Sequence, residues 1–259
     1  MKSQGHLESL ERQATVPPIR RVPAGRIAHW LAAGWHDLKA NPIPSLAYGL
    51  LFGLGGDMIL LASVAHPHLF SVAVSGFFLI APLLATGLYE LSRQHARGTH
   101  PTFIDSLRAF GSNGESIALF GVALALIAIF WERVSAIFFA LISHGMVSDI
   151  GQFISRTIIG GPQWGLVLTW FALGGLLALL TFALSVVSVP LMLDRKLDVV
   201  TAMLTSLHTF AANTGTLLLW AATIVVLTLL GFATLLFGLV VIMPILGHAS
   251  WHAYRDLVE

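Results

Sequence analysis

This sequence contains one very long uncharged stretch. Residues 199–254 contain no Asp, Glu, Lys or Arg across 56 consecutive positions. As a single helix the stretch would be about 84 Å long, nearly three times the ~30 Å hydrocarbon core of a bilayer. Only 10% of the chain is charged, whereas soluble domains carry roughly 25% charged residues to stay in water. The sequence therefore predicts an integral membrane protein.

The overall composition excludes several other classes of protein. The chain is 56% hydrophobic, which is too apolar for a disordered protein, and its glycines lack the period of collagen. It has no cysteine, so thiolate metal sites, iron–sulfur clusters and disulfides are excluded. Its net charge of +1 gives no reason to expect a nucleic-acid partner. We expect the lipid bilayer to be the main partner.

Hydropathy predicts six transmembrane helices. The apolar runs are continuous rather than alternating, which favours helices over a membrane β-barrel. The expected spans lie near residues 43–64, 69–91, 114–142, 164–190, 215–236 and 238–254.

The basic residues predict the orientation of these spans. Twelve of the fourteen Lys and Arg residues fall on one side: Lys2, Arg12, Arg20, Arg21, Arg26, Lys39, Arg93, Arg97, Arg108, Arg195, Lys196 and Arg255. The other side holds Arg156, while Arg133 lies in or at the end of the third span. Because basic loops stay in the cytoplasm, both termini are expected to be cytoplasmic.

A short motif recurs three times along the chain. Residues 106–113 read Ser-Leu-x-x-Phe-x-x-Asn, and residues 206–213 repeat that pattern. A looser copy, Gly-Trp-x-x-Leu-x-x-Asn, occupies residues 34–41. Each copy precedes an apolar span, and we interpret it as an amphipathic helix on the cytoplasmic surface. The closing Asn41, Asn113 and Asn213 are interpreted as structural helix caps.

These repeats predict the domain organisation. A flexible cytoplasmic tail, residues 1–29, precedes a single all-α transmembrane domain, residues 30–259. That domain would contain three parallel repeats, at about residues 30–93, 101–196 and 198–258, each a surface helix followed by a helical hairpin. Pro82, Pro190 and Pro244 would kink the second span of each repeat. An interfacial helix is expected in the long connection, residues 144–163.

Asp57 is the first candidate for chemistry. It is an acidic residue inside an apolar span, and it shares an i, i+4 stripe with Ser45, Gly49 and Gly53. Small-residue stripes mark close helix contacts, so Asp57 is expected to face the bundle interior. It would serve there as an ion or proton site, or pair with Arg133, or lie near a wet interface.

Two further groups of polar residues come next. Glu132 and Arg133 would form a polar pair inside the third span or an anchor at its end. His248 and His252 have the i, i+4 spacing that suits a metal or, with a partner helix, a haem. We expect neither a metal nor a haem there, because the nearby Arg255 places these histidines at the cytoplasmic interface. Catalytic motifs for hydrolysis or nucleotide binding are missing from the sequence.

Several longer segments resemble one known family. They are residues 33–38, 44–50, 87–93, 185–195, 198–203 and 247–257, the last reading Gly-His-Ala-Ser-Trp-His-Ala-Tyr-Arg-Asp-Leu. They resemble domain-of-unknown-function family 2189, predicted bacterial integral membrane proteins, over about residues 30–258. Some members are labelled as a cytochrome c oxidase subunit. That activity needs histidines buried at mid-span, which this sequence does not offer, so the resemblance implies a bacterial membrane protein of unknown activity.

Three functional hypotheses follow. The first is a non-enzymatic helix bundle of the bacterial inner membrane that is structural, acts as a scaffold, or modulates a membrane-protein partner or a second copy of itself. The second is a transporter of a small solute, an ion or protons, with Asp57 facing the bundle interior. The third is a haem or redox-complex subunit that uses His248 and His252. The first requires no cofactor.

Overall fold

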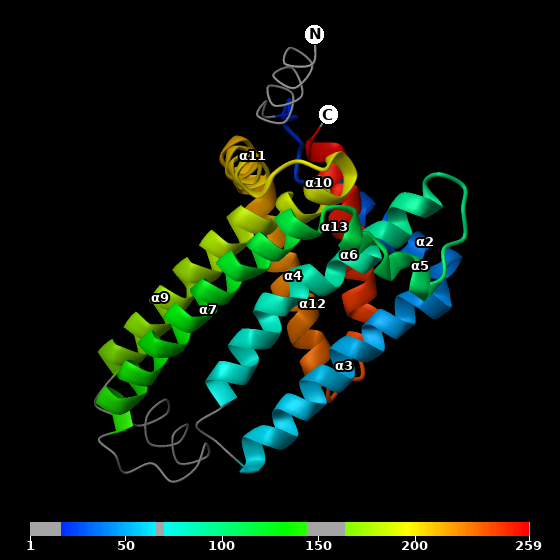
Figure 1. The fold of residues 1–259 in the computed structure, drawn as a ribbon. Coiled ribbons are helices and arrows are strands. Elements are labelled where there is room, and N and C mark those ends of the chain that lie inside the picture. Colours follow the sequence, from blue (N-terminus) through cyan, green and yellow to red (C-terminus); the bar gives the residue numbers. More distant parts are fainter. Residues whose placement is uncertain (1–16, 66–69, 144–163, 259) are drawn as a thin grey trace. The chain divides into compact units, whose positions relative to one another are not determined.

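The elements of the computed structural model, which describes residues 17–65, 70–143 and 164–258, are α-helices (Figure 1). In chain order they are α2 (Arg26–Ala40), α3 (Pro42–Ala65), α4 (Phe70–His95), α5 (Phe103–Leu107), α6 (Ala109–Ser112), α7 (Gly114–Ser143), α9 (Trp164–Ser185), α10 (Ser188–Arg195), α11 (Val199–Ala212), α12 (Thr214–Ala233) and α13 (Leu239–Leu257). The prediction of an all-α protein is therefore confirmed. An isolated antiparallel bridge joins Ile19 to Val258.

Three helical stretches in the described ranges are long and apolar enough to cross a bilayer. They are Gly114–Phe138, Trp164–Arg195 and Thr214–Ala233, and each coincides with an expected span. Helices α3, α4 and α13 occupy the places of the other three expected spans. The interfacial helix expected within residues 144–163 lies outside the described residues, as do the first sixteen residues of the expected tail.

The contacts divide the chain into two units. Unit 1 comprises Met1–Leu54, Ala81–Gly121 and Phe182–Glu259, and unit 2 comprises Gly55–Ile80 and Val122–Thr181. The chain passes from one unit to the other within α3, α4, α7 and α9.

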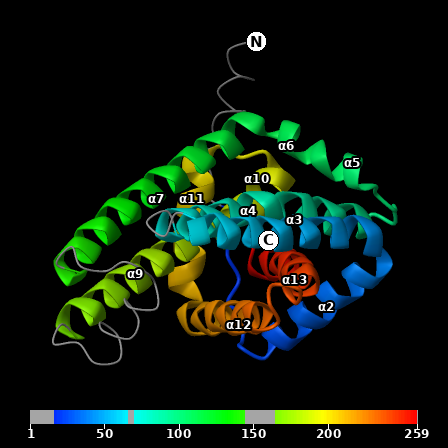
Figure 2. The same cartoon turned by 90° about the horizontal axis from the view of Figure 1, so that it is seen from below.

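Helix α13 organises unit 1. It packs against α2, α10 and α12, and Figure 2 shows it beside α2 and α12. Where α13 meets α2, a Cβ at Gly34 would lie 2.6 Å from the carbonyl oxygen of Ile245. Where it meets α3, a Cβ at Gly49 would overlap the carbonyl group of Val240. Because only glycine lacks a Cβ, these two residues let the helix backbones come into contact.

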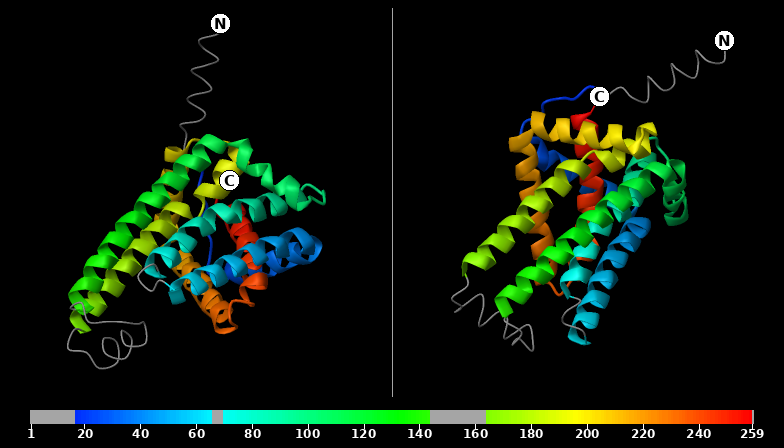
Figure 3. Two further views of the ribbon diagram at one scale, coloured as in Figure 1. Left: turned by 60° about the horizontal axis from the view of Figure 1, so that its bottom comes forward. Right: turned by 60° about the vertical axis from the view of Figure 1, so that its left-hand side comes forward.

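Helices α7 and α9 pack together in unit 2 through aromatic side chains. The rings of Trp131 and Trp170 are stacked with their centroids 5.5 Å apart, and the Trp170 indole N–H donates to the Ser135 hydroxyl over 3.1 Å. Gly174 leaves room for the Trp131 ring, since a Cβ there would lie 2.7 Å from it. Both views of Figure 3 show the two helices alongside one another.

All three prolines lie inside helices, and Pro190 follows a break between two of them. Pro82 is inside α4 and Pro244 inside α13. Helix α9 ends at Ser185 and α10 begins at Ser188, so the break surrounds Val186, whose carbonyl a helical Pro190 ring would contact. The N–H of Val187 donates to the Ser206 hydroxyl instead of continuing the helix.

Candidate functional site

Five polar side chains come together in unit 1, where α2, α3, α4 and α13 meet. They are Asp37, Ser45, Ser92, His248 and His252, and we call them the polar cluster. The first four are buried, and His252 is half-buried. Buried polar groups are costly unless they are hydrogen-bonded, so their partners decide what the cluster does.

His248 lies at the centre of the cluster between two serines. The Ser92 hydroxyl donates to Oδ2 of Asp37 over 2.6 Å. A hydroxyl carries a single proton, so the Ser92 oxygen must accept from Nδ1–H of His248, which lies 2.7 Å away. Nε2 of a neutral His248 then accepts from the Ser45 hydroxyl over 2.9 Å. The hydrogen-bond network therefore assigns the Nδ1–H tautomer to His248.

Asp37 receives a second donor from α13. Nε2 of His252 lies 2.9 Å from the same carboxylate oxygen, Oδ2, that Ser92 binds. Burial by itself raises the pKa of the Asp37 carboxyl, but the hydrogen bonds from His252 and Ser92 and the nearby charge of His252 outweigh it. The pKa of Asp37 is therefore lowered, and the carboxylate is ionised at neutral pH. An unbroken chain of hydrogen bonds runs from Ser45 to His252.

Two further imidazoles border Asp37. Nε2 of His95 lies 3.9 Å from Oδ1 of Asp37, and the rings of His36 and His95 have their centroids 5.8 Å apart. One side-chain nitrogen or oxygen from each of His36, Asp37 and His95 lies within 4.8 Å of the others. Within the described chain, this group is the one whose spacing suits a metal ion.

The two histidines singled out in the sequence are both in the cluster, but in different roles from those considered there. Both ring nitrogens of His248 are hydrogen-bonded to serines, so neither is left for a metal. Nε2 of His252 is bound to Asp37. As placed, the pair does not present two ligand nitrogens to one metal or haem.

The intramembrane candidates belong to unit 2. Asp57 is on α3 and half-buried. Glu132 and Arg133 form an ion pair with each other over 2.9 Å on α7, with the Arg133 side chain exposed. The interpretation of this pair as an anchor at the end of the span stays a prediction.

The three asparagines lie at helix junctions, and two of them also bind backbone groups of other segments. Asn213 precedes α12, yet within the described chain its side chain makes no capping bond to that helix. Its carboxamide instead accepts from the backbone N–H of Val22 over 2.7 Å and donates to the carbonyl of Arg20 over 2.9 Å. Asn113 donates to two carbonyls around the end of α10, and Asn41 ends α2. Asn113 and Asn213 therefore bind backbone groups of other segments, whereas the buried Nδ2 of Asn41 has no hydrogen-bond partner among the described residues.

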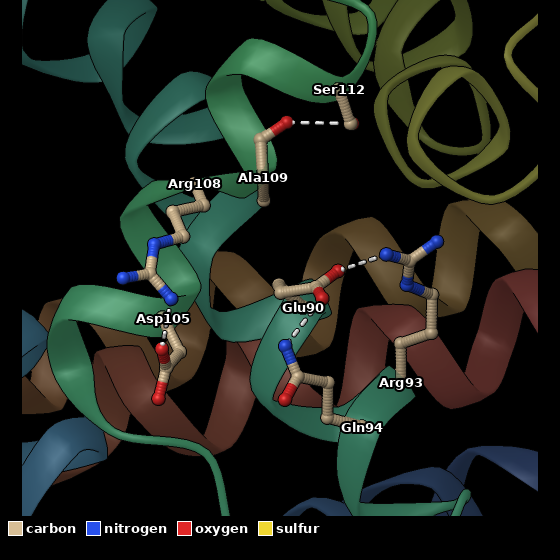
Figure 4. Close-up of a pocket in the computed structure, with 7 residues that line it drawn as sticks. All are labelled: Glu90, Arg93, Gln94, Asp105, Arg108, Ala109 and Ser112. Atoms are coloured by element: carbon tan, nitrogen blue, oxygen red, sulfur yellow. Dashed lines mark hydrogen bonds and ion pairs between the residues drawn. The ribbon is translucent and has the colours of Figure 1, made fainter.

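A separate hollow of about 390 Å³ lies between α4 and the short helices α5 and α6 (Figure 4). Glu90 is bound there by Arg93 and by Gln94, each over 2.7 Å. Asp105 pairs with Arg108 over 2.7 Å. Because each charge already has an opposite partner, the hollow has no net charge that would attract an ion.

Sequence reasoning missed three members of the polar cluster, Asp37, Ser45 and Ser92. Each is an ordinary polar residue near a helix end, and the i, i+4 stripe that contains Ser45 drew attention to Asp57 and not to a partner on another helix. One signal was present, because all five members lie in the segments that carry the family resemblance, at residues 33–38, 44–50, 87–93 and 247–257.

Comparison with known proteins supports the resemblance. The sequence model of one family, described as a predicted integral membrane protein (DUF2189), matches residues 69–194. This match includes Ser92 of the polar cluster. No curated protein and no solved structure matches the chain significantly.

Proposed function

Proceeding from this family match, we propose that the chain is a six-span protein of the bacterial inner membrane with a non-enzymatic role, as a scaffold or as a modulator of a membrane-protein partner. Its six spans form three parallel repeats of a surface helix and a helical hairpin, and both termini face the cytoplasm. The presence of three long apolar helices supports the proposal of membrane spans, and the one-sided distribution of basic residues supports the proposed orientation.

The observation that carries the proposed role is the closure of the polar cluster. The hydroxyls of Ser45 and Ser92 and both ring nitrogens of His248 are paired within the cluster, which ties α3 and α4 to α13. A fully satisfied buried network makes a core rigid and fixes one arrangement of its helices. A catalytic site would need polar groups turned toward a substrate. The network is therefore better suited to holding helices in place.

The outward faces of the helices fit a bilayer and a partner. Large apolar side chains are exposed along α3, α7, α9 and α12, among them Leu50, Leu54, Leu126, Leu168, Val225 and Leu229. In water such a surface would cause aggregation, whereas lipid tails or another membrane helix would cover it at no cost.

Proton or ion transport is the second candidate, favoured by one specific observation. Every group in the chain from Ser45 to His252 can accept and pass on a proton. Asp57 on α3 is a second group that can accept and release a proton. This hypothesis requires water to reach the buried face of α3, whereas the scaffold hypothesis requires that face to be dry.

Cysteine labelling separates the two hypotheses, because the natural chain has no cysteine. We would introduce Ser45→Cys, which is nearly isosteric, and Gly53→Cys, whose Cβ would lie 3.3 Å from a methyl group of Val240. Leu50→Cys and Leu54→Cys on the exposed face of α3 are the matched controls. Each variant is treated with a membrane-impermeant maleimide in intact cells and in inverted vesicles.

If the protein is a scaffold, Ser45→Cys and Gly53→Cys should remain unlabelled from both sides until the protein is denatured. Labelling of these two positions, with the two leucine controls silent, would overturn the scaffold proposal and make transport the leading hypothesis. Thr99→Cys, in the turn after α4, reports orientation: it should react in inverted vesicles and not in intact cells.

A further inference from the structure

The carboxylate of Asp37 has two oxygens in different surroundings. Oδ2 is occupied by the Ser92 hydroxyl at 2.6 Å and by His252 at 2.9 Å. Oδ1 faces His95, whose Nε2 is 3.9 Å away. This separation is too long for a hydrogen bond, which requires about 2.7–3.2 Å. Oδ1 of Asp37 therefore accepts no hydrogen bond from His95.

The spacing on that side is close to what one metal ion needs. Two ligand atoms that each bind Zn²⁺ at about 2.0–2.1 Å in tetrahedral geometry are about 3.3 Å apart. Nε2 of His95 and Oδ1 of Asp37 are 3.9 Å apart, and the ligand atoms of His36, Asp37 and His95 all lie within 4.8 Å of one another. Small rotations of the two imidazoles would complete the coordination.

The three residues differ in exposure in the way an accessible ion site requires. The Asp37 side chain is buried and fixed, the His95 side chain is 25% exposed, and His36 is at the surface. An ion can thus approach from solvent, and the two histidines can turn toward it. They come from two helices, His36 and Asp37 from α2 and His95 from the end of α4.

The polar cluster supplies the support that metal ligands ordinarily have. Metal-binding carboxylates are usually held by hydrogen bonds on their other oxygen, and these supporting groups orient the ligand. Ser92 and His252 bind Oδ2 of Asp37 in this way and leave Oδ1 for the ion. Because Asp37 is already oriented, little ordering would be needed on binding.

From this geometry we propose that His36, Asp37 and His95 bind one divalent first-row transition-metal ion of the Zn²⁺ type. Two imidazole nitrogens and one carboxylate oxygen are ligands that suit Zn²⁺, Co²⁺, Fe²⁺ and Ni²⁺. Three protein ligands leave a fourth position for water. Ser92 and His252 are positioning residues that act through Asp37. The ion joins α2 to α4, so the site goes beyond the scaffold role and does not depend on it.

The test is a titration of the purified full-length chain in detergent, prepared without a histidine tag and stripped of metal with a chelator. Zn²⁺ binding is followed by calorimetry, and Co²⁺ binding by its visible absorption. We expect one ion per chain. His36→Ala and His95→Ala should each weaken Zn²⁺ binding at least about tenfold. Since both side chains are at or near the surface, the variants should fold, which circular dichroism verifies.

Two further variants make the result specific. His208→Ala removes an exposed histidine on α11 and should leave Zn²⁺ affinity unchanged. Ser92→Ala should weaken binding about 10–100-fold while the Co²⁺ spectrum keeps its shape, as expected for loss of a positioning residue. Absence of one-to-one binding overturns the proposal. Equal affinity of the wild type, His36→Ala and His95→Ala also overturns it, because the ion would then bind elsewhere.

Discussion

Replacing Ser92 by alanine tests the central hydrogen bonds of the polar cluster. Ser92 is buried, and its hydroxyl donates to the Asp37 carboxylate while accepting from Nδ1–H of His248. The Ser92→Ala variant therefore removes one bond to a charged group and leaves the buried N–H of His248 unpaired. The space vacated by one oxygen atom is too small to hold a well-bonded water.

The expected loss can be worked out from these two bonds. A hydrogen bond to a charged group contributes about 1.5–3 kcal/mol, and a buried polar group left unpaired costs about 1–3 kcal/mol. His252 continues to hold the same carboxylate oxygen, which reduces the first of these contributions. We therefore expect Ser92→Ala to lower the free energy of unfolding by about 3 kcal/mol.

The assay is unfolding of the purified protein in detergent micelles, followed by the helical circular dichroism signal. Ser112→Ala is the matched control, because that hydroxyl bonds only to the carbonyl of Ala109 in its own helix, and its loss should cost less than about 0.5 kcal/mol. In a His248→Phe background the unpaired N–H no longer exists, so Ser92→Ala should cost at least about 1 kcal/mol less. Equal losses for Ser92→Ala and Ser112→Ala would refute the reasoning.

Three other changes give separate tests. Gly174→Ala should displace the Trp131 ring, lower the free energy of unfolding by about 1–3 kcal/mol and alter the near-ultraviolet circular dichroism. Gly175→Ala is the control and should change neither quantity, because a Cβ at Gly175 meets nothing within 4 Å. Asp256→Ala removes the acceptor of the buried Trp30 indole N–H on α2 and should lower the unfolding free energy by about 1–3 kcal/mol in the same micelle assay. A loss below about 0.5 kcal/mol would contradict this. Burial raises the pKa of the Asp198 carboxyl, but hydrogen bonds from the following α11 residues outweigh it and lower that pKa, so the cap stabilises α11 above about pH 4 and this contribution is lost as pH falls through the lowered pKa. Thermal unfolding between pH 6 and pH 3 should therefore be less pH-dependent in Asp198→Asn, and curves parallel to the wild type would argue against the cap.

Much of the fold follows from the sequence because apolar length is a local property. The runs at residues 114–138 and 214–233 are too long and too apolar for a soluble helix, and both are helices of the expected kind. The motif at residues 206–213 also falls on a helix, α11, whose end is set by Asn213. Local patterns do not show which other segment each helix packs against. Asn213 illustrates this, since its side chain binds a backbone segment about 190 residues earlier in the chain.

The candidate site was less predictable for the same reason. His248 and His252 attract attention because their spacing is visible on one helix. Asp37 and Ser92 do not, because their partners are 215 and 156 residues away in sequence. The direction in which a polar side chain points depends on helix packing, and the contact between α2 and α13 rests on the missing side chain of Gly34. Such a contact has no signature within a short window of sequence.

The pairing of the first described helix with the last has a consequence for biosynthesis. The Trp30 indole binds Asp256, 226 residues further along the chain. At about 5–20 residues per second, a ribosome adds that length in roughly 10–45 s. For most of this interval Gly34 and Asp37 have been synthesised and α13 has not. The nascent protein must therefore carry an open α2 face until α13 is inserted, and a chain that stops short of α13 would expose that face permanently to membrane quality control.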